Sequence, residues 1–160
     1  MATVTVNAVD LIAKFQYAYD NKWGYIYGSW HTKWTQALQD QKVNYMVNKY
    51  GSGWKTSAAA KEDNYYMAAA YGSKWIGQWV TDCSGLFYWA FKELGGYMYH
   101  GSNTMWKSYC TSQGTLKSGK RADGKELKPG TAVFVLKSNG NRSHVGLYIG
   151  GGNIIEASGT

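Results

Sequence analysis

The sequence predicts an α+β fold, with helices in its first half and a small antiparallel sheet towards its C-terminus. Before residue 95, apolar residues recur at three- and four-residue spacing, the pattern of a helix face packed on a core. After the single proline, Pro129, short apolar runs alternate with glycine- and asparagine-rich turns, as in antiparallel strands. With 160 residues, 44% of them hydrophobic, the chain can bury a core as one domain over residues 1–160.

Four stretches of the first half have helical spacing. They cover residues 7–20, 35–50, 57–71 and 83–94. Asn7 and Asp82 lie at or just before the start of the first and the last of these, and both are residue types that cap helix N-termini. Gly51-Ser52-Gly53 separates the second stretch from the third, and Gly95-Gly96 ends the last one.

The second half is expected to consist of loops, one short helix and three strands. The short helix runs through residues 104–109 within a loop that spans residues 97–114. Residues 117–128 are basic but interrupted by glycine and acidic residues, so they indicate a solvated loop. The strands are expected at residues 131–137, 144–150 and 153–158, and the first two are joined by a turn at Asn139-Gly140.

Cys83 is expected at or near the first position of the helix that follows Asp82. Unpaired N–H groups and the positive end of the helix dipole favour an anion at that position. A thiol there has a lowered pKa and is more often the nucleophilic thiolate. Because most cysteines outside disulfides are simply small buried hydrophobes, Cys83 needs a partner before it indicates catalysis.

His144 and Glu156 are candidate partners from neighbouring strands. A carboxylate in the apolar run around Glu156 is costly without a hydrogen-bonding partner, and a nearby histidine would supply one. Cysteine, histidine base and orienting carboxylate then form a catalytic set, although a lone histidine is more often a satisfied core residue. The two residues are twelve apart, so they share a sheet face only if Gly150–Gly152 closes an odd loop or a strand carries a one-residue bulge.

Three motifs occur in an order that is typical of one family. They are DCSGL at residues 82–86, LKPGTAVFV at 127–135 and HVGLYIGGGNIIEA at 144–157. Through them the chain resembles the NlpC superfamily of cell-wall cysteine peptidases over roughly residues 76–158, with a further aromatic-glycine piece, WGYIYG, at 23–28. The resemblance implies a papain-like fold, in which a helical N-terminal half with the nucleophile at a helix N-terminus packs on a small antiparallel sheet.

By the same resemblance, Cys83 is the nucleophile, His144 the base and Glu156 the third polar residue. The third position is more often histidine in the family, so Glu156 departs from the commonest pattern. The substrate site would be bordered by Tyr25, Asp82 and Ser84, with Tyr25 across the groove from Cys83.

The resemblance implies hydrolysis of an amide bond in peptidoglycan stem peptides through a thioester, foremost the bond between D-γ-glutamate and the diamino acid. An N-acetylmuramoyl-L-alanine amidase is the alternative hydrolase. A non-catalytic wall-binding module is a third hypothesis. It is favoured by the eight Trp and fourteen Tyr residues, because aromatic side chains with a polar group line carbohydrate and peptide grooves well. Residues 29–80 form a long aromatic-rich insertion between two motifs, which is either a specificity lobe or extra scaffold.

Charge and composition constrain the partners. Seventeen basic and ten acidic residues give a net charge of +7, which implies an anionic partner such as nucleic acid or a bacterial wall. No nucleic-acid motif accompanies the charge, so no nucleic-acid partner is expected. Cys83 and Cys110 lack metal-type spacing, and His31 and His100 have polar, loop-like neighbours, so no cofactor or metal is expected. Since a Cys83–Cys110 disulfide would inactivate the enzyme, both thiols are expected to be reduced.

The expected setting is the bacterial cell wall, outside the cytoplasm or in the periplasm. Residues 1–5 do not resemble a signal peptide, and no apolar run reaches membrane-spanning length. We therefore expect a monomer without membrane association, delivered as a bacteriolytic, phage-type endolysin or within a longer exported protein. Family domains usually continue beyond the strand at Glu156, which predicts that the chain is a fragment.

Overall fold

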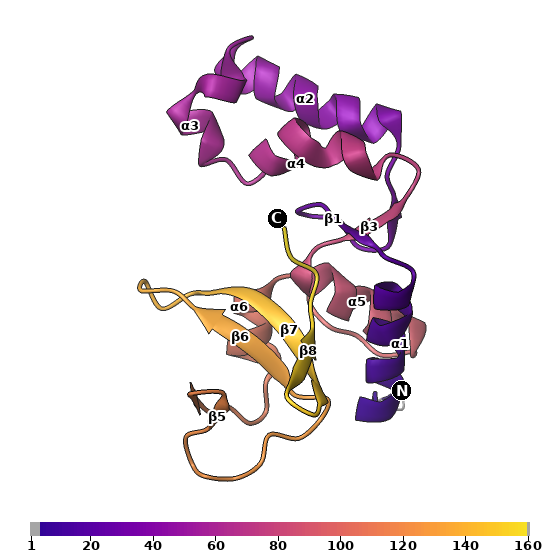
Figure 1. Cartoon of the computed structure of the whole chain (residues 1–160), viewed down its shortest axis with the longest axis vertical. Helices are drawn as coiled ribbons and strands as arrows, with labels where there is room; N and C mark the ends of the chain where they lie inside the picture. Colours follow the sequence, from indigo (N-terminus) through magenta and orange to yellow (C-terminus); the bar gives the residue numbers. More distant parts are fainter. Residues whose placement is uncertain (1–3, 160) are drawn as a thin grey trace. The chain divides into compact units, whose positions relative to one another are not determined.

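The computed structural model describes residues 4–159 and resolves two compact units (Figure 1). The first unit comprises the described residues up to Lys22 together with Cys83–Ala157, and the second comprises Trp23–Asp82 with the segment from Ser158. The prediction of one domain over residues 1–160 concerns both units together and stays a prediction. Part of residues 1–5, where no signal peptide is expected, lies outside the described residues.

Two helices form the helical layer of the first unit. Helix α1 (Ala8–Asp20) begins as predicted at Asn7, whose side chain accepts a hydrogen bond from the Asp10 N–H at 2.8 Å. Helix α5 (Cys83–Glu93) packs against α1, and the rings of Phe15 and Phe87 meet edge to face with centroids 4.7 Å apart. This contact buries both rings completely or nearly so, which fixes α5 in the core.

The sheet of the first unit has three antiparallel strands in the order β6-β7-β8 (Figure 1). They are β6 (Ala132–Leu136), β7 (Arg142–Gly150) and β8 (Asn153–Ile155). Val145, Leu147 and Ile155 are buried, and both α1 and α5 pack against β7. Helices on one side of a small antiparallel sheet confirm the predicted α+β class.

The rest of the first unit consists of short elements. They are α6 (Ser102–Thr104), the π-helical η3 (Met105–Tyr109), β4 (Leu116–Lys117) and β5 (Lys120–Arg121). The prediction of a solvated loop over 117–128 was wrong at its start, where β4 and β5 pair as a hairpin, whereas residues 122–126 are exposed and irregular. Ser118 and Gly119 close it with positive φ angles of 49° and 76°, as tight hairpin turns require.

The second unit combines a small mixed sheet with a helical layer (Figure 1). The strands are β1 (Gly24–Tyr25), β2 (Thr32–Lys33) and β3 (Trp79–Thr81), with β3 in the middle, parallel to β1 and antiparallel to β2. The helices are α2 (Gln36–Tyr50), η1 (Trp54–Thr56), α3 (Ala58–Lys61), α4 (Tyr66–Tyr71) and η2 (Gly72–Trp75).

A buried amide joins the two main helices of the second unit. The Gln39 side chain, which is 4% exposed, accepts a hydrogen bond from the Trp34 indole N–H at 3.0 Å. Its amide N–H donates to the carbonyls of Ala68 and Ala69, at 3.2 and 3.0 Å, at the end of α4. A buried polar group with its partners supplied specifies one arrangement of α2 and α4.

The helix predicted over residues 57–71 is interrupted between α3 and α4. Asp63 accepts a hydrogen bond from the Tyr65 N–H at 2.9 Å, so its side chain replaces a helical carbonyl as acceptor. The same carboxylate accepts from Lys49 and from the Tyr50 hydroxyl, both at 2.8 Å, which ties the break to α2. The prediction of one continuous helix was therefore wrong, because the Asp63 side chain takes the place of a backbone acceptor.

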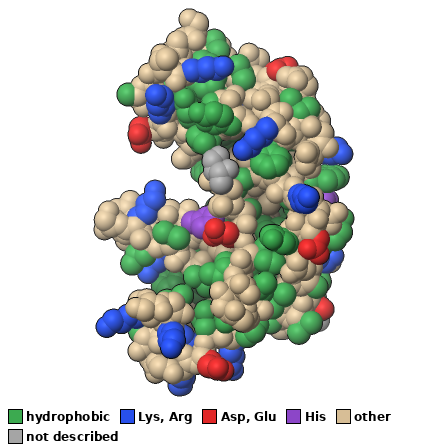
Figure 2. Space-filling model, viewed as in Figure 1, with side chains coloured by type: hydrophobic (Ala, Val, Ile, Leu, Met, Phe, Trp, Pro, Cys, Tyr) green, Lys and Arg blue, Asp and Glu red, His purple; other side chains and the backbone are tan. Residues whose placement is uncertain are grey.

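Basic side chains are spread over the visible face among polar and apolar ones and do not gather in one patch (Figure 2). Within residues 4–159, every helix is too short or too polar to span a bilayer.

The Asp63 contacts predict how stability depends on pH. Burial by itself would raise the pKa of Asp63, but hydrogen bonds from Lys49, the Tyr65 amide and Tyr50 outweigh it and hold this pKa well below its usual range. The carboxylate therefore stabilises the fold above pH about 4, and this contribution is lost as the pH falls further. We expect Asp63→Asn to lower the melting temperature at pH 7, and the gap to wild type to narrow below pH 4.

Circular dichroism melts between pH 7 and pH 2.5 measure the melting temperature of each protein and the gap between variant and wild type. Asp40→Asn, which changes an exposed carboxylate of α2, is the control. A gap for Asp63→Asn that stays constant over this range would contradict a stabilising charge.

Candidate active site

Cys83 is the first residue of α5, as the sequence predicts. Cys83 and Ser84 are 8% and 4% exposed, so the start of the helix is embedded in the unit. The helix ends as predicted, with Gly95 at a φ of +77° and the Gly96 N–H donating to the Phe91 carbonyl at 2.8 Å. Because α5 packs against β7, the cysteine belongs to the helix that covers the strand carrying His144.

His144 and Glu156 form a direct contact. Nε2 of His144 lies 2.7 Å from Oε2 of Glu156, so the expected meeting of these two side chains is confirmed. Their side chains are 22% and 46% exposed, which leaves the pair open to solvent on one side. A carboxylate on Nε2 favours the tautomer with its proton on that nitrogen and leaves Nδ1 as the basic atom.

The register of the β7–β8 hairpin explains this contact. Tyr148 pairs with Ile154, but the next pair is Gly150 with Asn153, so Ile149 is an extra residue on β7. Gly151 and Gly152 close the hairpin with φ angles of +61° and +80°, as in a two-residue primed turn. Such a turn alone would place Glu156 on the face opposite His144, and the bulge restores the shared face.

Gly146 provides the room for the carboxylate. It lies between His144 and Tyr148 on the same strand face, opposite the continuation of β8. A Cβ atom at this glycine would be 3.2 Å from Cβ of Glu156 and 2.7 Å from Cγ2 of Ile154. The absence of a side chain at Gly146 therefore allows β8 to approach and Glu156 to reach His144.

Asp82 has a structural contact that the sequence pattern did not reveal. Its side chain, in a residue that is 5% exposed, accepts a hydrogen bond from the Gly28 N–H at 2.7 Å, and its own N–H donates to the Ser29 carbonyl at 2.9 Å. Asp82 thus holds the loop after β1 in the second unit. Its partner is 54 residues earlier in the chain, so no local pattern could indicate it.

Tyr25 also belongs to the second unit, where it pairs in register with Thr81 and lines a pocket. Cys83 belongs to the first unit, so the prediction that Tyr25 lies across the groove from it stays a prediction.

Cys110 has different surroundings from Cys83. It follows the π-helix η3, and burial raises the pKa of its thiol, which makes it a poor nucleophile at neutral pH. Both cysteines lie in the described part of the chain and are not joined by a disulfide. Over residues 4–159, groups of three or more His, Cys, Asp and Glu side chains placed to hold a metal ion are absent.

His31 and His100 are both half-buried and lie against aromatic rings. The His31 ring stacks between Trp23 and Trp79, at centroid distances of 4.8 and 4.2 Å, and its backbone has a φ of +41°. The ring of His100 stacks on Tyr88 at 6.1 Å.

A cysteine that opens a helix packed on an antiparallel sheet, with a histidine–carboxylate pair on that sheet, defines the class of papain-like cysteine hydrolases. The NlpC/P60 family profile matches residues 64–160, and the chain belongs to this family. Its members are cysteine peptidases that hydrolyse peptidoglycan in the bacterial cell wall. The WGYIYG piece at 23–28 lies outside the matched range. No curated protein and no solved structure matches the chain.

The packing at Gly146 leads to a prediction. Gly146→Ala should move β8 and lengthen the contact between His144 and Glu156, because Cγ2 of a β-branched isoleucine cannot easily give way. We expect a loss of about 1–3 kcal/mol in unfolding free energy and a lower kcat for wall hydrolysis. Denaturant unfolding and turbidity clearing of purified walls measure the two effects.

Gly114→Ala is the matched control, since a Cβ there would meet nothing within 4 Å. Equal stability and turnover in the two alanine variants would contradict the packing role of Gly146.

Proposed function

We propose that the chain is an endopeptidase that cleaves the bond between D-γ-glutamate and the diamino acid of peptidoglycan stem peptides. The observation that most supports hydrolysis by a cysteine nucleophile is the 2.7 Å contact between His144 and Glu156 in the unit that also holds Cys83. Family membership supplies the substrate polymer, and the bond itself is part of the proposal.

Cys83 is the proposed nucleophile. Its thiolate attacks the scissile carbonyl carbon, and the tetrahedral oxyanion accepts hydrogen bonds from backbone N–H groups at the start of α5. The protonated His144 then donates its proton to the leaving amine, the C–N bond breaks and a thioester remains. Water, deprotonated by His144, attacks the thioester and releases the acid and the thiolate.

Glu156 is the proposed orienting residue. Its carboxylate fixes the imidazole with Nε2–H towards itself and stabilises the imidazolium that forms during each proton transfer. Because the carboxylate is nearly half exposed, solvent screens part of this effect.

Tyr25, Asp82 and Ser84 are the proposed borders of the substrate site. The buried Asp82 carboxylate accepts from the Gly28 N–H, which supports a role in shaping the loop after β1. The net charge of +7 favours approach to an anionic wall. We propose that the protein acts there as a monomeric, bacteriolytic enzyme of the endolysin type.

The proposal predicts opposite results for the two cysteines. Cys83→Ala should abolish wall hydrolysis, because the nucleophile is lost, whereas Cys110→Ser should keep it. Release of amino groups from purified peptidoglycan measures both. A Cys83→Ala protein with wild-type activity would refute the mechanism, and loss of activity in both variants would require intact folding to be checked by circular dichroism.

Mass spectrometry of the released muropeptides identifies the bond. We expect fragments that end in D-glutamate and others that begin with the diamino acid. Free lactyl groups on muramic acid would instead indicate an N-acetylmuramoyl-L-alanine amidase, and the absence of any product would indicate a wall-binding module.

Removal of the orienting carboxylate should reduce turnover less than removal of the nucleophile. We expect Glu156→Ala to lower kcat by about 10²–10⁴ with the fold retained. Glu156→Gln keeps the size of the side chain and serves as the comparison for charge. An unchanged kcat in Glu156→Ala would end the assignment of this residue.

A further inference from the structure

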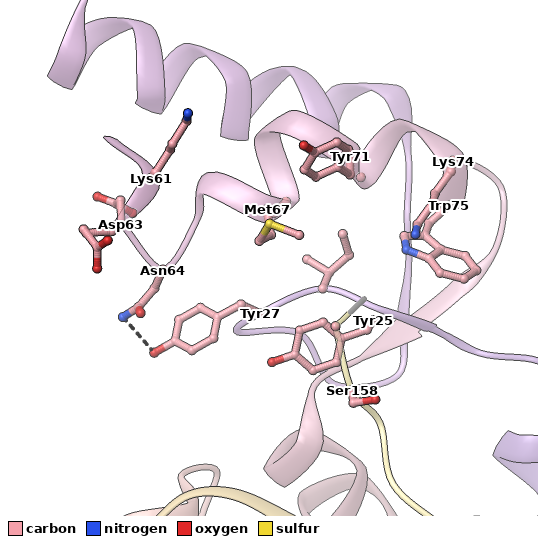
Figure 3. A pocket seen from close by; sticks show the side chains of 15 residues that line it. Tyr25, Tyr27, Lys61, Asp63, Asn64, Met67, Tyr71, Lys74, Trp75 and Ser158 are labelled. Carbon is pink, nitrogen blue, oxygen red and sulfur yellow. Dashed lines mark hydrogen bonds between the residues drawn. The ribbon is translucent and has the colours of Figure 1, made fainter. Parts of the chain in front are cut away.

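The second unit contains a pocket of about 310 Å³ (Figure 3). Three segments line it: the end of β1 with the loop after it, the stretch from Lys61 to Trp75, and residues 158–159. Its volume is at the lower end of the range for small-molecule sites, which suits one sugar ring with its substituents.

Apolar and aromatic side chains face each other across this pocket. Met67 and Tyr71 lie one turn apart on α4 and are 47% and 53% exposed, while Tyr66 and Ala69 on the same helix are buried. Figure 3 shows Tyr25 and Tyr27 on the opposite side. Large exposed apolar side chains that surround a hollow are typical of a binding site.

The walls of the pocket are held in place before any ligand binds. The Trp75 indole packs so closely on Gly24 that a Cβ atom on this glycine would lie 2.3 Å from the ring. Nζ of Lys74 lies 5.0 Å from the centre of the same ring. The Asn64 amide donates to the Tyr27 hydroxyl at 3.3 Å (Figure 3). A largely pre-formed pocket needs little ordering when it binds.

The charges that line the pocket balance. Lys61 and Lys74 carry positive charge, and Glu62 and Asp63 carry negative charge. Lys49, which pairs with Asp63 at 2.8 Å, adds one positive charge beside the lining. A polyanion therefore gains little here from electrostatic attraction. A neutral ligand with a C–H face for aromatic rings and with hydroxyl or amide groups for Asn64 and the tyrosine hydroxyls suits the lining better.

We propose that this pocket binds an N-acetylated amino sugar of the peptidoglycan glycan strand, as a second contact with the substrate besides the peptide. The sugar ring packs on Tyr71, its acetyl methyl group contacts Met67, and its polar groups reach Asn64 and the tyrosine hydroxyls. The inference rests on the proposed function, since the glycan strand carries the stem peptides. It also assigns residues 29–80 a role in substrate recognition.

The test uses chitotetraose, a soluble oligomer of N-acetylglucosamine, with the Cys83→Ala protein as host. We expect binding by calorimetry, with amide chemical-shift changes at residues 61–75. Adding Tyr71→Ala or Met67→Ala should raise Kd about 3- to 10-fold each, the loss expected for one stacking or apolar contact. Tyr97→Ala removes a 60% exposed tyrosine of the first unit and should leave Kd unchanged.

Three results would overturn the proposal. The first is an equal Kd for chitotetraose in Tyr71→Ala and in the host protein. The second is amide chemical-shift changes at residues 61–75 with a free stem pentapeptide but not with the sugar, and the third is tighter binding of poly(glycerol phosphate) than of chitotetraose. Because binding is measured in a protein without the nucleophile, these results leave the hydrolytic proposal untouched. In the active protein, Tyr71→Ala should lower the ratio of wall hydrolysis to hydrolysis of a soluble stem peptide.

Discussion

In the β7–β8 hairpin, one extra residue decides which face of the sheet Glu156 occupies. The turn at Gly151-Gly152 has two residues, and with plain pairing it would direct the carboxylate away from His144. The bulge at Ile149 shifts the register by one residue, and Gly146 leaves the space into which the carboxylate extends. The 2.7 Å contact, and with it the proposed chemistry, follows from backbone geometry at these few positions.

Much of the fold could be predicted because it depends on local patterns. Apolar spacing and capping residues placed α1, α2 and α5 within one or two residues, and turn residues placed β6 and β7. The break at Asp63 was missed, because a side chain replaced a backbone acceptor without disturbing the apolar spacing. The β4–β5 hairpin was missed, since two-residue strands with mostly exposed side chains show no alternation.

The site was predictable in part. The start of α5 at Cys83 follows from the residue types around it. The even spacing of His144 and Glu156 required an odd loop or a bulge, but it did not show that the bulge lies at Ile149. Contacts between distant segments could not be read from spacing. The hydrogen bond from Gly28 to Asp82 and the stacking of His31 between two indoles depend on how the second unit folds.

The proposed chemistry requires that His144 activates the Cys83 thiol, and the rate of Cys83 alkylation tests this most directly. Iodoacetamide labelling at pH 7, followed by mass spectrometry of the peptides, reports Cys83 and Cys110 in the same sample. We expect Cys83 to react at least about tenfold faster than Cys110, and His144→Ala to slow the alkylation of Cys83 alone. A Cys83 that reacts no faster than Cys110, or that is indifferent to His144→Ala, would contradict it.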